Sequence, residues 1–104
     1  MMKIRIYTDT DGHAPFEYWL EALPDRIARA KIRARVARVE SGNFGDCKLL
    51  RDGVSEMRID YGPGYRVYFM RRGFALVILL AGGNKSTQDA DIARAITIAK
   101  EWSD

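Results

Sequence analysis

Hydrophobic and polar residues alternate at the start of the chain and then change to a longer period. Residues 2–7, MKIRIY, alternate with a period of two, which is typical of a β-strand with one buried face. Residues 8–12 are rich in Thr, Asp and Gly and predict a turn. Residues 16–23 then place apolar side chains at helical spacing, and Pro15 suits the first turn of that helix.

A second helix is predicted over residues 25–41, and its side chains separate into distinct faces at 100° steps. One apolar face is expected to pack on the core. Its members are Ala28, Ile32, Val36 and Val39. A second face carries small side chains and is expected to stay open to a partner. Its members are Ile27, Ala30, Ala34 and Ala37. The two helices together are expected to form an αα-hairpin.

The second half of the chain carries three strand signals after a segment that resembles a loop. Residues 43–54 have no clear periodicity and include or adjoin three glycines. Residues 55–60 alternate, residues 65–71 are aromatic and β-branched, and residues 74–81 are wholly apolar, as in a central strand. Two tight turns separate these strands, which predicts a three-stranded antiparallel meander.

A C-terminal helix is expected to follow Ser86 or Thr87, either of which suits its N-cap. The predicted order is strand, helix, helix, strand, strand, strand, helix, and the predicted fold class is α+β. The chain has 104 residues, which fit one domain over residues 1–104.

Charge and composition narrow the functional classes. Lys and Arg total 17 against 14 acids, a net charge of +3, which by itself is weak evidence for nucleic-acid binding. The second helix is more informative, because it carries six bases with no acid among them. They are Arg26, Arg29, Lys31, Arg33, Arg35 and Arg38. This run is either a solvated face or a surface for ribosomal RNA phosphates.

Several functions are not expected. Cys47 is the single cysteine, so no internal disulfide can form, which suits a reducing cytoplasm, and it is expected to be a packing residue. No secretory signal or membrane span is visible, so a cytoplasmic location without a membrane partner is expected. The single histidine, His13, is expected at the surface, and no Cys/His cluster predicts a metal or another cofactor.

Two short motifs, YGPGYRVYF at residues 61–69 and GGNKSTQ at residues 82–88, together resemble the RelE/HigB-like toxins called addiction-module killer proteins. The segment FEYWLEALPD and the Arg/Ala-rich helix ending in SGNFGD resemble the same group, so the resemblance covers nearly the whole chain. It implies a small antiparallel sheet packed against a helical hairpin. It also implies a type II toxin that cuts messenger RNA at the ribosome and is silenced by an antitoxin, expected to be a small helix-turn-helix protein.

RNA cleavage without a metal needs the ribose 2′-hydroxyl to attack the adjacent phosphate. One group must remove the 2′ proton, another must stabilise the added negative charge, and a third must protonate the leaving 5′ oxygen. Arginine suits the second role, because its planar guanidinium binds phosphate with two hydrogen bonds and stays charged. Lysine can act as an acid, or as a base where its pKa is lowered.

The resemblance implies catalytic roles for three basic residues. Arg66 takes the position of an arginine that acts on the scissile phosphate, Lys85 that of a catalytic basic residue, and Arg58 that of a basic residue on the preceding strand. Each has a structural alternative. Arg66 could be a strand arginine in a salt bridge, and Lys85 a solvated loop residue. Arg58 could form an ion pair with Glu56 or Asp60.

Further contacts are expected around these residues. Arg51, Arg29 and Arg33 are candidates for RNA phosphates. Tyr61 and Tyr65 are candidates for stacking on a base or ribose, although strand aromatics also serve as core residues or cross-strand pairs. The antitoxin is expected on the small-sided helix face, at residues Ile27, Ala30 and Ala34.

The chain departs from the family in its proton-transfer groups. HigB-type enzymes often carry histidines in the sheet or near the C-terminus, and RelE has a C-terminal tyrosine, whereas the last helix here has neither. Either Lys85 transfers protons or the ribosome aligns the substrate. Two alternatives therefore stay open: a ParE-like inhibitor of DNA gyrase that is not an enzyme, and an inactive toxin that only co-represses with its antitoxin.

Overall fold

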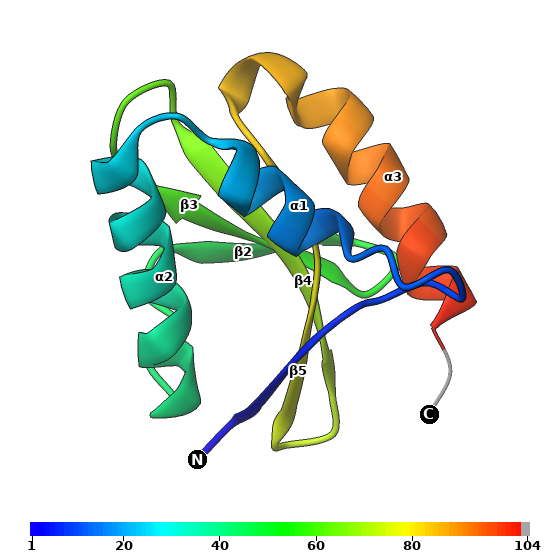
Figure 1. Cartoon of the computed structure of the whole chain (residues 1–104). Helices are drawn as coiled ribbons and strands as arrows, with labels where there is room; N and C mark the ends of the chain where they lie inside the picture. The colour runs from blue at the N-terminus through cyan, green and yellow to red at the C-terminus, as the bar shows by residue number, and fades with distance from the viewer. Residues whose placement is uncertain (103–104) are drawn as a thin grey trace.

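A five-stranded mixed sheet forms the centre of the computed structural model, which describes residues 1–102, and helices cover both of its faces (Figure 1). The fold class is α+β. The elements are β1 (Lys3–Ile6), α1 (Pro15–Ala22), α2 (Arg26–Glu40), β2 (Cys47–Arg51), β3 (Val54–Ile59), β4 (Tyr65–Arg72), β5 (Leu76–Gly83), a short 3-10 helix η1 (Lys85–Thr87) and α3 (Gln88–Glu101). The strand order is β1-β5-β4-β3-β2, in which β1 runs parallel to β5 and every other pair is antiparallel. Among the described residues, no helix is long and apolar enough to cross a bilayer.

The prediction of a loop over residues 43–54 was wrong, because β2 lies within it. The sheet therefore has four consecutive antiparallel strands in place of the expected three, and β1 adds a parallel fifth. β2 is an edge strand held by its backbone pairing with β3, and most of its side chains are exposed. Such a strand has no buried face to create a period-two pattern, so hydrophobic periodicity could not detect it.

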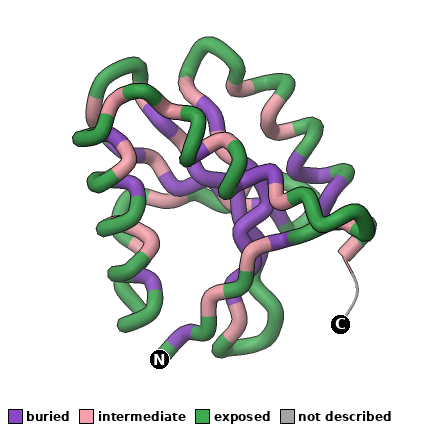
Figure 2. The backbone as a smooth tube through the Cα atoms, viewed as in Figure 1, coloured by how far each residue is buried: buried purple, intermediate pink, exposed green. Residues whose placement is uncertain are grey.

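One face of the sheet packs against α1 and α2. The predicted phase of α2 is confirmed: Ala28 and Ile32 are fully buried, whereas Ile27 is 59% exposed. Buried, intermediate and exposed positions follow one another along this helix (Figure 2). Asp25 caps α2 by accepting hydrogen bonds from two backbone N–H groups of the first turn. The core on this side joins both helices to β3, β4 and β5. Its buried members include Phe16, Leu20, Ile32, Met57, Val67, Phe69 and Leu79.

The two helices lie mainly on the sheet rather than along each other, α1 on β5 and α2 on β1 and β3. A groove of about 210 Å³ opens between them. The expected packing of α1 and α2 as an αα-hairpin is therefore not confirmed. The apolar lining of the groove consists of Ile4, Ile6, Phe16, Leu20, Val36, Ala37 and Leu79, and its charged rim of Glu17, Arg33 and Glu40.

The other face of the sheet packs against α3. Ala95, Ile98 and Ala99 of this helix join Tyr68 and Leu80 in a second core. Its first turn approaches the end of β5 closely. A Cβ atom at Gly83 would lie 1.7 Å from an Asp91 carboxylate oxygen, and one at Gly82 would lie 2.1 Å from the Trp19 ring on the opposite face. The two glycines thus let α1 and α3 meet the same end of β5.

Candidate functional site

Two arginines lie directly opposite each other on neighbouring strands. Arg58 of β3 pairs with Arg66 of β4 in the sheet register, and the short connection through residues 60–64 sets that register. Side chains of directly opposed residues share a face of the sheet, here the face that α3 covers. Like charges in this arrangement repel each other, so the pair needs an acid close by.

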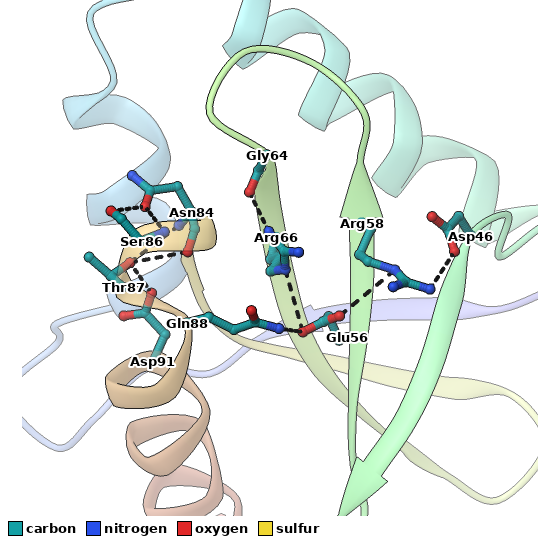
Figure 3. A network of polar contacts seen from close by, with 10 residues as sticks. All are labelled: Asp46, Glu56, Arg58, Gly64, Arg66, Asn84, Ser86, Thr87, Gln88 and Asp91. Carbon is teal, nitrogen blue, oxygen red and sulfur yellow. Dashed lines mark hydrogen bonds and ion pairs between the residues drawn. The ribbon is translucent and has the colours of Figure 1, made fainter.

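Glu56 is that acid, and it is buried with 2% of its surface exposed. Its Oε1 lies 3.8 Å from Arg58 Nε, and its Oε2 lies 3.6 Å from Arg66 Nε. Gln88, at the start of α3, donates a hydrogen bond of 2.8 Å from Nε2 to Glu56 Oε2 (Figure 3). One carboxylate therefore serves both arginines and connects them to α3.

The two arginines are held differently at their outer ends. Arg66 is 12% exposed, and its Nη1 donates to the Gly64 carbonyl at 2.7 Å. Arg58 is 43% exposed, and its Nη2 lies 3.1 Å from Asp46 Oδ1. Both side chains border a surface pocket of about 220 Å³. A water molecule takes up about 30 Å³ in the liquid, so the pocket has room for several water molecules. A phosphate group, with one phosphorus and four oxygen atoms, therefore fits in it. The remaining lining is Asp46, Ile59, Asp60 and Gly64.

Lys85 lies at the same end of the sheet. Its backbone N–H donates to the Pro63 carbonyl at 3.4 Å, and its Cβ lies 3.5 Å from the position a Cβ atom would take at Gly64. The side chain is exposed in η1, outside the lining of the pocket. The structure thus gathers the three catalytic candidates, Arg58, Arg66 and Lys85, around the turn between β3 and β4.

The tyrosine candidates differ in their accessibility. Tyr65 is buried and meets the Trp19 ring at a centroid distance of 6.2 Å, so the structure favours the alternative role of a core residue. Tyr61 is half-buried, and its hydroxyl donates to Asp25 Oδ2 at 2.9 Å. This hydrogen bond raises the pKa of Tyr61. The Lys31 Nζ lies 5.3 Å from the centroid of the Tyr61 ring, which ties the turn to α2.

The basic run of α2 divides between structural and exposed members. Arg35 donates to the carbonyls of Arg58 at 2.6 Å and Phe44 at 3.1 Å, so it holds the segment before β2 against β3. Arg29 donates to the Leu23 carbonyl at the start of the helix. Arg33 is exposed at the rim of the groove between α1 and α2, away from the pocket.

The remaining candidates lie apart from the pocket. Arg51 is exposed at the end of β2. Cys47 is half-buried and packs against the core on the side of α1 and α2, as expected of a packing residue, and this burial raises the pKa of its thiol. His13 is exposed before α1, with its ring 5.5 Å from that of Tyr18. The proposed antitoxin residues Ile27, Ala30 and Ala34 are all exposed on α2.

Sequence reasoning missed one residue that holds the site together and gave another only part of its role. Gln88 was assigned no role, although it is the last residue of the GGNKSTQ motif. Glu56 was expected as one possible ion-pair partner of Arg58, and that ion pair is present, but its second ion pair with Arg66 was not expected. A partial signal was present in the sequence, because Glu56 lies two residues before Arg58 in an alternating segment and so shares its face of the strand.

Residues 18–103 match the sequence model of a family described as Phage derived protein Gp49-like (DUF891). A protein of Haemophilus influenzae (strain ATCC 51907 / DSM 11121 / KW20 / Rd), described as uncharacterized, is 54% identical over 86 residues. That alignment covers 83% of this chain and 87% of the relative. The residues matched by the family include the whole pocket from Asp46 to Arg66, together with Lys85 and Gln88.

Proposed function

The chain belongs to the Phage derived protein Gp49-like family, and on that basis we propose that it is the toxin of a bacterial type II toxin–antitoxin pair. It acts in the cytoplasm as a ribosome-dependent endoribonuclease of the RelE/HigB type and inhibits translation by cutting messenger RNA. The observation that carries this proposal is the pair of opposed arginines, Arg58 and Arg66, at a pocket large enough for a phosphate group.

The chemistry follows from what these side chains can do. The ribose 2′ oxygen forms a bond to phosphorus as its proton passes to a water molecule, and the bond from phosphorus to the 5′ oxygen breaks as that oxygen gains a proton from Lys85. The products are a 2′,3′-cyclic phosphate and a 5′-hydroxyl end. Arg66 and Arg58 bind the phosphate oxygens and stabilise the charge that develops there. Lys85 acts as the general acid that protonates the leaving 5′ oxygen, because its flexible side chain can extend from η1 to the bound RNA.

The ribosome supplies the alignment that the toxin itself lacks. His13, the single histidine, is in the segment before α1 and does not line the pocket. The pocket has a volume of about 220 Å³, so it has room for one phosphate group but does not enclose an RNA strand. Bound messenger RNA held in the decoding site would present one phosphate in a fixed orientation, which lowers the entropic part of the barrier.

We expect purified toxin to cut messenger RNA only when translating ribosomes are present, and to leave supercoiling by DNA gyrase unchanged. The reason is that an arginine pair stabilises charge but cannot by itself orient the 2′-hydroxyl. The measurement is primer extension on a defined transcript with and without ribosomes, beside a gyrase supercoiling assay. Blocked supercoiling with intact transcripts would establish the gyrase inhibitor instead. Operator binding together with an antitoxin, without growth arrest, would establish the co-repressor.

Asp46 competes with the substrate for Arg58, so its neutralisation should strengthen RNA binding. The exposed Asp46–Arg58 pair is worth about 0.2–1 kcal/mol. We therefore expect Asp46→Asn to tighten the binding of a short single-stranded RNA about two- to fivefold, measured by fluorescence anisotropy at low salt. Asp11→Asn makes the same charge change in the exposed turn before α1 and should have a smaller effect. Equal changes in both variants would mean that only net charge matters.

The antitoxin is proposed to dock on the exposed face of α2 formed by Ile27, Ala30 and Ala34. These side chains are small or apolar and project away from the core, so another helix can approach closely. The neighbouring groove between α1 and α2 extends this surface, since Ala37 of the same face lines it. A small helix-turn-helix antitoxin with an apolar, acid-flanked segment suits this site, because bases flank the face.

A further inference from the structure

Glu56 is the one charged residue among residues 1–102 that is buried. Removing a carboxylate from water costs several kcal/mol unless charges and hydrogen bonds compensate it. Here the compensation comes from Arg66 Nε at 3.6 Å, Arg58 Nε at 3.8 Å and the Gln88 hydrogen bond of 2.8 Å. An apolar side chain at this position would avoid the cost but would leave the two opposed arginines without a shared counterion.

The hydroxyl of Tyr68 does not help to compensate the charge of Glu56. Tyr68 pairs directly with Glu56 on β4 and is fully buried. Burial, followed by the charge of Glu56, raises the pKa of Tyr68, so its hydroxyl stays neutral. Within the described residues that hydroxyl has no hydrogen-bond partner. The charge of Glu56 is therefore balanced by the arginines rather than by proton exchange with Tyr68.

The contacts made by Glu56 determine which edge of each guanidinium is available to a ligand. In both arginines Nε is buried and lies at ion-pair distance from the carboxylate, although neither Nε–H has a hydrogen-bond partner among the described residues (Figure 3). The attraction is therefore between charges, and the Nη groups lie at the far end of each side chain. Arg66 uses Nη1 for the Gly64 carbonyl, and Arg58 uses Nη2 for the exposed Asp46. A guanidinium has five N–H groups in a rigid plane, so fixing Nε fixes the direction of the others.

We propose that Glu56 is a positioning residue that holds the Nε edges of Arg58 and Arg66 on one carboxylate, so that their Nη edges face a single phosphate group. Gln88 holds the carboxylate itself and makes the start of α3 part of the arrangement. The effect of Glu56 on catalysis rests on the proposed RNA-cleaving function. The arrangement of the arginines, however, can be measured in the free protein without any RNA.

The first measurement is ¹⁵N NMR of the arginine Nε–H groups in the full chain. Exchange of the Arg66 Nε–H with water should be at least tenfold slower than that of Arg72, which is exposed at the end of the same strand. In Glu56→Gln, which keeps the shape but removes the charge, the Arg66 and Arg58 signals should shift and exchange at least tenfold faster. Glu40→Gln makes the same change on the exposed surface of α2 and should leave both signals unchanged.

The second measurement is ribosome-dependent cleavage by the same variants. Glu56→Gln should lower kcat at least tenfold, because the two arginines lose their fixed orientation. It should change KM less than threefold, because Glu56 is buried and the charged side chains that line the pocket stay the same. Glu56→Asp keeps the charge on a shorter stem and should restore part of kcat. A purely structural role would lower the melting temperature without this division between kcat and KM.

The outcomes separate the two proposals. Unchanged arginine signals in folded Glu56→Gln, or equal exchange of Arg66 and Arg72 in the native protein, would overturn the positioning role whatever the activity. Loss of folding in both Glu56 variants, with Glu40→Gln folded, would assign Glu56 a structural role and overturn it too. Shifted arginine signals in a native protein that does not cut RNA would support the positioning and refute the proposed function.

Discussion

Replacing Arg66 with alanine should abolish growth arrest when the protein is induced without its antitoxin. Arg66 is the less exposed member of the opposed arginine pair, and its guanidinium is held by both Gly64 and Glu56. Loss of a fixed donor that stabilises transition-state charge lowers the rate by a factor of about 10²–10³. Such a loss should bring cleavage below the level that stops growth, as measured by colony counts and by the cleavage rate on ribosomes.

The control must separate chemistry from stability. Arg66→Ala leaves Glu56 with Arg58 and Gln88, and a weakened set of partners around a buried acid costs about 1–3 kcal/mol. Thermal unfolding should therefore be measured for every variant. Arg66→Lys keeps the charge without the planar fork and should be intermediate. Arg72→Ala removes an exposed arginine from the same strand and should remain toxic. Full toxicity of a folded Arg66→Ala protein would exclude a catalytic role.

The same substitution should lower the stability of the toxin on one face of α2 and weaken antitoxin binding on the other. Ala28 is fully buried, so Ala28→Glu would place a carboxylate in the core and should cost more than about 4 kcal/mol of unfolding free energy. Ala34 is exposed, so Ala34→Glu should change the stability by no more than about 0.5 kcal/mol. The complex with the antitoxin should nevertheless weaken at least tenfold, because the new charge lies in the middle of the proposed docking face.

Urea denaturation of the free toxin and calorimetric titration with the antitoxin would measure these two effects. A stable Ala34→Glu toxin that binds normally would place the antitoxin elsewhere, and the groove between α1 and α2 would then be the next surface to test. Binding that fails only in proportion to lost stability would mean that Ala34 supports the fold rather than the interface.

Hydrophobic periodicity predicted those elements whose buried face is regular. The phase of α2 followed from its own residues because a helix with one core-facing stripe repeats every 3.6 residues, and Ala28, Ile32 and Val39 are buried as that repeat requires. β5 was recognisable as an interior strand because both of its faces are covered, although the predicted strand began at Phe74, which is 98% exposed before β5. β2 has no regularly buried face. It is held by backbone pairing with β3, which cannot be predicted from the pattern of hydrophobic and polar side chains.

The resemblance to the RelE/HigB-like toxins suggested Arg58, Arg66 and Lys85 as candidates, and the alternation of residues 55–60 placed Glu56 and Arg58 on one face. It left open whether the arginines faced solvent, a salt bridge or each other. The tertiary structure decided this through the register of β3 and β4 and through α3, whose first turn brings Gln88 to Glu56 across 32 positions of sequence. It likewise assigned Arg35, one of six similar bases, to the carbonyls of Arg58 and Phe44. Periodicity is a property of neighbours along the chain, whereas the neutralisation of a charge depends on groups that meet only after folding.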